Sequence, residues 1–281
     1  MVKFGPSGNC ISFYEAGHKS TLEAGKWLKE IGLDAYEYSF CRGVTVSDET
    51  AISIGKEMRE NGITISAHAP YFINLANEND EMAEKSFQYI TNSLYKLRLL
   101  GGKNLVVHPG SLMKLSREKA VELTKKRLVQ LKSILTETDN LDMKVCLETM
   151  GKFSQIGTYQ EIVDFCQICD AYYPAFDFGH INCILQGGLK TKQDFLDIFN
   201  YAIERLGYEK VKNCHIHFSK IQYGTKGEIK HLTLDDDIYG PEFEPLAEAI
   251  KELGLEPIII CESRDVMALD AIKLKNIYKN T

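Results

Sequence analysis

The sequence predicts an α/β fold, a single (β/α)8 TIM barrel that covers residues 1–281 as one domain. Three observations lead to this prediction. The length of 281 residues is close to the usual size of one such barrel. Short β-type segments alternate strictly with amphipathic helical segments, which indicates a parallel sheet. Eight such pairs follow one another, and eight is the number of units that closes a barrel.

The strands are expected where short apolar runs lie between turn residues, because strands buried on both faces read as apolar. Their expected ranges are 2–6, 35–40, 64–67, 104–107, 144–147, 173–176, 211–218 and 257–261. For the helices, Ser47 is a candidate N-cap, and Gly32 and Gly62 are typical helix ends. The expected helices are 22–31, 47–62, 81–100, 117–136, 159–169, 192–206, 243–253 and 266–278.

The composition is that of an ordinary globular protein, with 44% hydrophobic and 26% charged residues. The net charge of −6 argues against a broad nucleic-acid surface, although bound divalent cations would add positive charge where a phosphate docks. There is no apolar run of about 18 residues and no signal-peptide layout at the N-terminus. We therefore expect a cytoplasmic monomer without membrane association, and we interpret the eight cysteines as reduced thiols.

Ionisable residues stand at the ends of six of the expected strands. They are His68, His108, Glu148, Asp177 followed by His180, His215 followed by His217, and Glu262. One further histidine, His231, lies in the long polar loop after the seventh strand. The carboxyl ends of barrel strands meet at one mouth, where active sites lie, so we expect these side chains to converge there.

This set of side chains indicates a metal site. Imidazole and carboxylate ligands without cysteine suit Zn²⁺, Mn²⁺ or Fe²⁺. The alternative, several independent buried ion pairs in one mouth, is costly. The eight candidate ligands are His68, His108, Glu148, Asp177, His180, His215, His231 and Glu262. Eight ligands are too many for one ion, so two or three ions are expected, and such clusters are typical of in-line phosphoryl chemistry.

At this point the sequence resembles the endonuclease IV family of apurinic/apyrimidinic endonucleases. The resemblance covers essentially the whole chain, and its most specific segments are residues 68–75, 107–111, 147–149, 177–180, His215 with Lys220, His231 and Glu262. It implies a TIM barrel with a zinc cluster that cleaves damaged double-stranded DNA 5′ to abasic sites in base excision repair.

The same resemblance implies a role for each ligand. His68 and His108 would hold one zinc, and Glu148 would bridge two. Asp177, His215 and Glu262 would hold the second ion, and His180 and His231 the third. Glu148 and Glu262 are the candidate catalytic residues, and Tyr71, Arg42 and Lys220 are the candidate DNA contacts.

The chain departs from the family pattern at the third ion. Ile229 stands where the family has an aspartate, two residues before His231. Glu228 would replace that aspartate after a small backbone shift, and His217 is a second candidate, because strand alternation points it the same way as His215. The loop at residues 41–44 also differs from the family's DNA-contacting loop, which indicates a divergent subgroup.

A second hypothesis is a sugar isomerase or epimerase of the xylose isomerase-like barrels. Such an enzyme would use one divalent ion and move a proton beside a carbonyl with two glutamates. Its ligands would be Glu148, Asp177, His215 and Glu262. The discriminating residues are His68, His108, His180 and His231, which a one-metal isomerase does not need.

Overall fold

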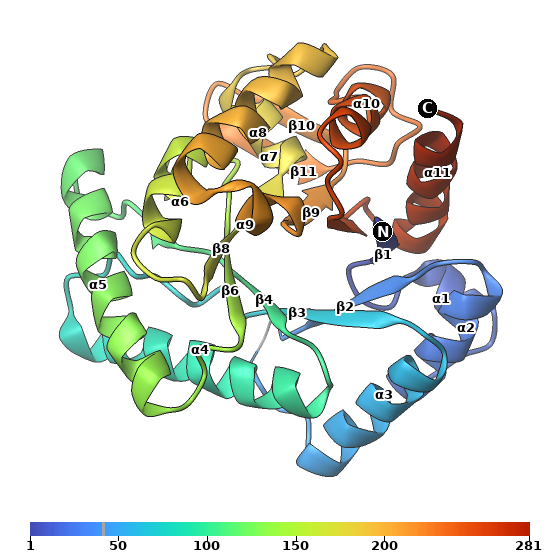
Figure 1. Ribbon diagram of the computed structural model, residues 1–281, viewed down its shortest axis with the longest axis horizontal. Helices are drawn as coiled ribbons and strands as arrows, with labels where there is room; N and C mark the ends of the chain where they lie inside the picture. Colours follow the sequence, from blue (N-terminus) through green and yellow to red (C-terminus); the bar gives the residue numbers. More distant parts are fainter. Residues whose placement is uncertain (41–42) are drawn as a thin grey trace.

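The computed structural model describes residues 1–40 and 43–281, and at its centre eight parallel strands form one barrel surrounded by helices (Figure 1). In sheet order the strands are β1 (Lys3–Pro6), β12 (Ile258–Cys261), β9 (His215–Phe218), β8 (Tyr172–Asp177), β6 (Lys144–Glu148), β4 (Asn104–Val107), β3 (Thr64–His68) and β2 (Ala35–Ser39). The predicted fold class is confirmed.

The barrel closes between β1 and β2. Ser7 forms a parallel bridge to Glu37, and the amide of Asp34 donates to the carbonyl of Phe4 at 2.9 Å. Gly5 permits this close approach, because a Cβ there would lie 1.8 Å from the carbonyl oxygen of Ala35. The two strands at the ends of the sheet order therefore meet, and the wall of the barrel is continuous.

The helices cover the outside of the barrel with their apolar faces. Several begin at a residue whose side chain accepts an amide hydrogen bond in the first turn, as Ser47, Asn79, Ser116 and Thr158 do. The longer helices are α2 (Ala24–Glu30), α3 (Asp48–Glu60), α4 (Asp80–Leu99), α5 (Arg117–Glu137), α6 (Tyr159–Cys166), α8 (Lys192–Leu206), α10 (Glu244–Glu252) and α11 (Met267–Asn280). Shorter turns are α1 (Ile11–Glu15), η1 (Thr21–Glu23), α7 (Phe178–Ile184) and α9 (Tyr208–Lys212). No helix among the described residues is long and apolar enough to span a membrane.

The seventh strand is shorter than the range 211–218 that the sequence predicts. Gly207, with φ of 83°, ends α8, and the chain then turns into α9. The apolar residue that suggested a strand, Val211, is instead the buried residue of α9, and β9 begins at His215. A buried apolar residue fits a helix as well as a strand, and a segment this short has no periodicity that would distinguish a helix from a strand.

Two small antiparallel sheets, which the sequence analysis treated as loops, stand on the carboxyl ends of the strands. β5 (Gly110–Ser111) pairs with β7 (Gln155–Ile156), and β10 (Ile221–Gly224) pairs with β11 (Gly227–His231). An isolated bridge between Lys152 and Gly227 joins the loop after β6 to the β10–β11 hairpin. Together they build walls around the mouth of the barrel.

The strand register arranges the inward side chains in layers. At the mouth, His68 is level with Ser39, and Asp177 is level with His217. One layer lower, about 6–7 Å down each strand, Glu37 is level with Ser66, and His215 is level with Ala175. Polar residues thus occupy two layers of the barrel interior.

Candidate metal centre

The mouth of the barrel holds a pocket of about 250 Å³. Its wall includes His68, His108, Glu148, His180, Glu228, His231, Glu262, Tyr71, Lys152, Gln155, Met150, Ser7 and Ser39. Most of the predicted ligands therefore lie around one space. The strands place them there because each ligand stands at or just beyond the carboxyl end of its own strand.

Glu148, at the end of β6, lies between two groups of histidines. Its Oε2 lies 3.1 Å from His68 Nε2 and 2.9 Å from His108 Nε2. Its Oε1 lies 3.3 Å from His217 Nδ1 and 3.5 Å from His180 Nδ1. The carboxylate is buried, and its two oxygens face different groups. Each oxygen would therefore be available to a different ion.

Hydrogen bonds fix the orientation of the imidazole rings. His68 Nδ1 lies 2.7 Å from the carbonyl of Ala69, and His231 Nδ1 lies 2.8 Å from the hydroxyl of Ser219. In both rings the other nitrogen, Nε2, is turned toward a carboxylate of the pocket. Histidines that bind metals are commonly held in this way by a partner on the second ring nitrogen.

A second group consists of Glu148, Asp177, His217 and Glu262, whose ligand atoms all lie within 4.8 Å of one another. His215, which is expected in this group from the sequence, lies instead with Glu37 and His217 in a separate group. Asp177 is level with His217, whereas His215 lies one layer deeper beside Ala175. Alternation points both histidines inward, but only the residue nearer the strand end reaches the mouth.

The third group consists of His180, Glu228 and His231. His180 Nε2 lies 3.6 Å and His231 Nε2 lies 3.8 Å from the carboxylate of Glu228. Ile229 is the extra residue of a β-bulge in β11. On its two sides Lys230 pairs with Gln222 and Glu228 pairs with Tyr223, so no residue of β10 pairs with Ile229. This bulge turns Ile229 outward, with 57% of its surface exposed, and brings Glu228 to the face that carries His231. Of the two predicted substitutes, Glu228 occupies the third group and His217 the second.

Burial and neighbouring charges oppose each other in this centre. Burial lowers the pKa of both His68 and His180, but neighbouring carboxylates outweigh it. Glu148 raises the pKa of His68 to about 9. Asp177 and Glu148 raise the pKa of His180 to about 10. Burial raises the pKa of Glu148, yet the surrounding histidines hold it well below its usual range. The pKa of Asp177 is raised by burial and by the nearby charges of Glu262 and Glu148.

The residues present fit a metal ion. Asp177 Oδ2 is buried and accepts no hydrogen bond among the described residues. Three carboxylates, Glu148, Asp177 and Glu262, crowd one space, and a cation between them would relieve their repulsion. The donors are imidazole nitrogens and carboxylate oxygens without thiolates, a set that suits Zn²⁺, Mn²⁺ or Fe²⁺.

The predicted DNA contacts have different positions. Tyr71 lines the pocket with 52% of its surface exposed. Lys220 does not face the pocket: its ammonium group is buried and lies 2.6 Å from Glu242 and 2.8 Å from the carbonyl of Asp236. The prediction of a phosphate contact at Lys220 is corrected accordingly. Arg42 lies outside the described residues.

Two residues of the site escaped the sequence analysis. Lys152 lines the pocket from the loop after β6, and no motif marks it. Glu37 is fully buried in the barrel and contacts both His215 and His217. A signal for Glu37 was present, because a carboxylate in the middle of an apolar barrel strand is unusual and needs partners.

The fold and this site define a barrel protein with a histidine–carboxylate centre at the carboxyl ends of its strands. The model of the xylose isomerase-like TIM barrel family matches residues 26–276, and the chain belongs to this family. An uncharacterized protein of Methanocaldococcus jannaschii is 32% identical over 282 residues, which cover 99% of this chain and 97% of that protein.

Two other kinds of relative bear on the site. A probable endonuclease 4 of Staphylococcus carnosus is 31% identical over 185 residues, which cover 63% of this chain but only 60% of that protein. The structure of endonuclease IV from Thermus thermophilus matches with a TM-score of 0.69 at 19% identity, over 99% of this chain and 98% of that one. The 3-keto-D-glucoside 4-epimerase of E. coli matches with a TM-score of 0.71 at 17% identity, over the full length of both. The structural likenesses show the fold, and the resemblance to endonuclease IV is confirmed as a sequence similarity over part of the chain.

Proposed function

We propose that the protein is a metal-dependent phosphodiesterase that hydrolyses DNA 5′ to abasic sites with two or three zinc ions. The observation that carries this proposal is the position of Glu148. One carboxylate oxygen faces the pair His68 and His108, and the other faces His217 and His180. An enzyme that uses one ion does not need a second pair of histidines on the other oxygen of a shared carboxylate, whereas an enzyme with several ions does.

Three groups of side chains would hold the ions. The first group is His68, His108 and Glu148. The second is Glu148, Asp177, His217 and Glu262, so that Glu148 belongs to both. The third is His180, Glu228 and His231. Zinc ions in such a cluster polarise a phosphoryl oxygen and lower the pKa of a bound water. Glu148 and Glu262 are the proposed catalytic carboxylates. The side chain of Glu262 keeps 18% of its surface exposed at the pocket, where a carboxylate can exchange a proton with substrate.

One specific observation favours the alternative, a sugar epimerase or isomerase with one divalent ion. The group of Glu148, Asp177, His217 and Glu262 is complete as a single-ion site, and it contains two glutamates. Two carboxylates on opposite sides of a small substrate would suffice to remove and return a proton beside a carbonyl.

Elemental analysis of protein purified without chelator distinguishes the two proposals. We expect two to three zinc ions per chain. We also expect the loaded protein to nick a duplex that carries one abasic analogue, and His108→Ala to slow this nicking by about 100-fold or more, since one catalytic ion contributes several kcal/mol. His18→Ala is the matched control, because His18 does not line the pocket and its ring stacks on Phe13.

One ion per chain, with ketose turnover that survives His108→Ala, would favour the epimerase instead. An intact duplex after incubation with protein that holds its full complement of zinc would overturn the nuclease proposal.

A further inference from the structure

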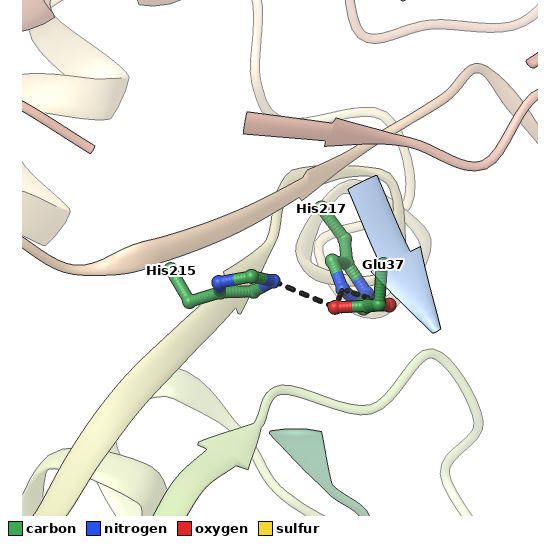
Figure 2. A group of neighbouring side chains, drawn as sticks. All are labelled: Glu37, His215 and His217. Carbon is green, nitrogen blue, oxygen red and sulfur yellow. Dashed lines mark hydrogen bonds and ion pairs between the residues drawn. The ribbon is translucent and has the colours of Figure 1, made fainter. Parts of the chain in front are cut away.

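A second cluster of ionisable side chains spans two layers of the barrel, with Glu37 and His215 in the layer below His217. It consists of Glu37 on β2 and of His215 and His217 on β9 (Figure 2). All three side chains are fully buried. A buried carboxylate is costly unless hydrogen bonds compensate it, so each contact of Glu37 matters.

Three donors converge on Glu37. His215 Nε2 lies 2.9 Å from Oε2, and the hydroxyl of Ser66 donates to the same oxygen at 3.2 Å. His217 Nε2 lies 3.1 Å from Oε1 and 3.3 Å from Oε2. Figure 2 shows both rings directed at the carboxylate from different sides. Each ring turns its Nε2 toward a carboxylate oxygen, and the hydrogen bonds of His215 and Ser66 both end on Oε2, whereas Oε1 accepts none among the described residues.

His217 connects this cluster to the metal centre. While Nε2 faces Glu37, Nδ1 lies 3.3 Å from Glu148 Oε1 and 3.5 Å from Glu262 Oε1. A neutral imidazole carries one proton, and the nitrogen without it offers the lone pair that binds a metal. A proton kept on Nε2 by Glu37 leaves the lone pair on Nδ1, at the mouth.

His215 holds the carboxylate from below. Its Nε2 donates to Glu37, while its Nδ1 is buried and has no hydrogen-bond partner among the described residues. The only described hydrogen bond of the ring is therefore the one to Glu37. His215, which the sequence suggests as a metal ligand, contacts Glu37 instead, and Glu37 in turn contacts the candidate ligand His217.

We propose that Glu37, held by His215, is a positioning residue that orients His217 and keeps its proton on Nε2, so that Nδ1 binds the ion shared with Asp177 and Glu262. This inference rests on the proposed function, because it assumes that the upper group binds a metal. Carboxylates that orient a ligand histidine in this way typically change metal affinity 10- to 100-fold.

The test is zinc affinity, measured by competition with a chelating dye. Glu37→Gln keeps the shape of the side chain and removes its charge, and we expect one zinc per chain to bind 10- to 100-fold more weakly. The ion at His68 and His108 should keep its affinity. Ser66→Ala is the matched control: it removes one hydrogen bond to Glu37 but leaves both histidine contacts, and its zinc affinity should stay close to that of the wild type.

A second measurement does not depend on how the variant folds. In zinc-loaded wild-type protein with ¹⁵N-labelled histidine, NMR should find His217 and His215 both protonated on Nε2. An unprotonated Nε2 on both rings would mean that an ion sits between them and Glu37, and it would overturn the proposal.

The remaining outcomes separate the two proposals. A wild-type protein that holds no zinc overturns both the proposed function and this inference. A wild-type protein that binds zinc, with Glu37→Gln binding every ion equally tightly, overturns this inference alone.

Discussion

Lys152 and Lys220 both lie at the carboxyl end of the barrel, but their ammonium groups have different surroundings. Lys152 lines the pocket, its side chain is 45% exposed, and its nearest carboxylate, Glu228, is 3.9 Å away. Lys220 has a 7% exposed side chain that contacts Glu242 and the carbonyl of Asp236. A buried ammonium group held by internal partners is less available to a phosphate than an exposed one with a distant partner.

We therefore expect opposite effects from the two alanine variants. Lys152→Ala should weaken binding of DNA and reduce the slope of log K against log salt by about 1. Lys220→Ala should leave that slope unchanged and lower the free energy of unfolding by about 1–3 kcal/mol, because it removes a buried polar contact. Titrations at several salt concentrations and urea unfolding measure the two effects. A reduced salt slope in Lys220→Ala would contradict the assignment.

At the level of elements, the β10–β11 hairpin decides which residue completes the third group. A regular strand would place Ile229 and His231 on one face, since side chains alternate with a period of two. The extra residue in β11 shifts that alternation, so Glu228 takes the inner face instead.

This bulge gives a prediction about rescue. Glu228→Ala should abolish binding of the third ion, and adding Ile229→Asp should not restore it, because residue 229 faces solvent. Ile229→Asp alone should change stability by no more than about 0.5 kcal/mol, as expected of an exposed position. Zinc counts by elemental analysis and thermal melts provide the readouts. Restored zinc in the double variant would show that the hairpin adopts a regular register.

The strand register also separates the two histidines of β9. His217 shares its level with Asp177, and His215 shares its level with Ala175. Spacing along one strand does not reveal which of the two stands at the mouth, because the level depends on how β8 and β9 align. A separate alignment, that of β2 with β3, places Glu37 one layer below His68.

For the molecule as a whole, the eight strands bring buried carboxylates and imidazoles into one end of the barrel. Without a cation, Glu148, Asp177 and Glu262 lie close together, and Asp177 Oδ2 lacks a hydrogen-bond partner. The free energy of zinc binding is therefore expected to stabilise the folded state, since the unfolded chain holds no preformed site.

Removal of metal should accordingly lower the melting temperature. One zinc at 100 times its Kd contributes about 2.7 kcal/mol, which corresponds to a shift of about 5–10 °C for a protein of this size. Calorimetry with and without chelator measures the shift. Glu148→Gln should show a smaller difference between the two conditions, because it weakens two groups at once. An identical Tm with and without chelator would argue against bound metal.

The sequence by itself determined the barrel, the positions of its eight strands and of the longer helices, and the ionisable residues at the mouth. These follow from local signals: apolar runs, capping residues, helix-ending glycines, and ionisable residues at strand ends. The main local error was the segment that forms α9, where one apolar residue fitted either element.

Only the tertiary structure decided that His217 rather than His215 lies with Asp177 and Glu262, and that Glu228 rather than Ile229 lies with His180 and His231. It also decided that Lys220 is held inside a loop and that Glu37 lies under His217. Each of these facts depends on register between neighbouring strands, on a bulge, or on contacts between residues far apart in the chain. Such relations arise when the barrel closes, and short sequence patterns carry no information about them.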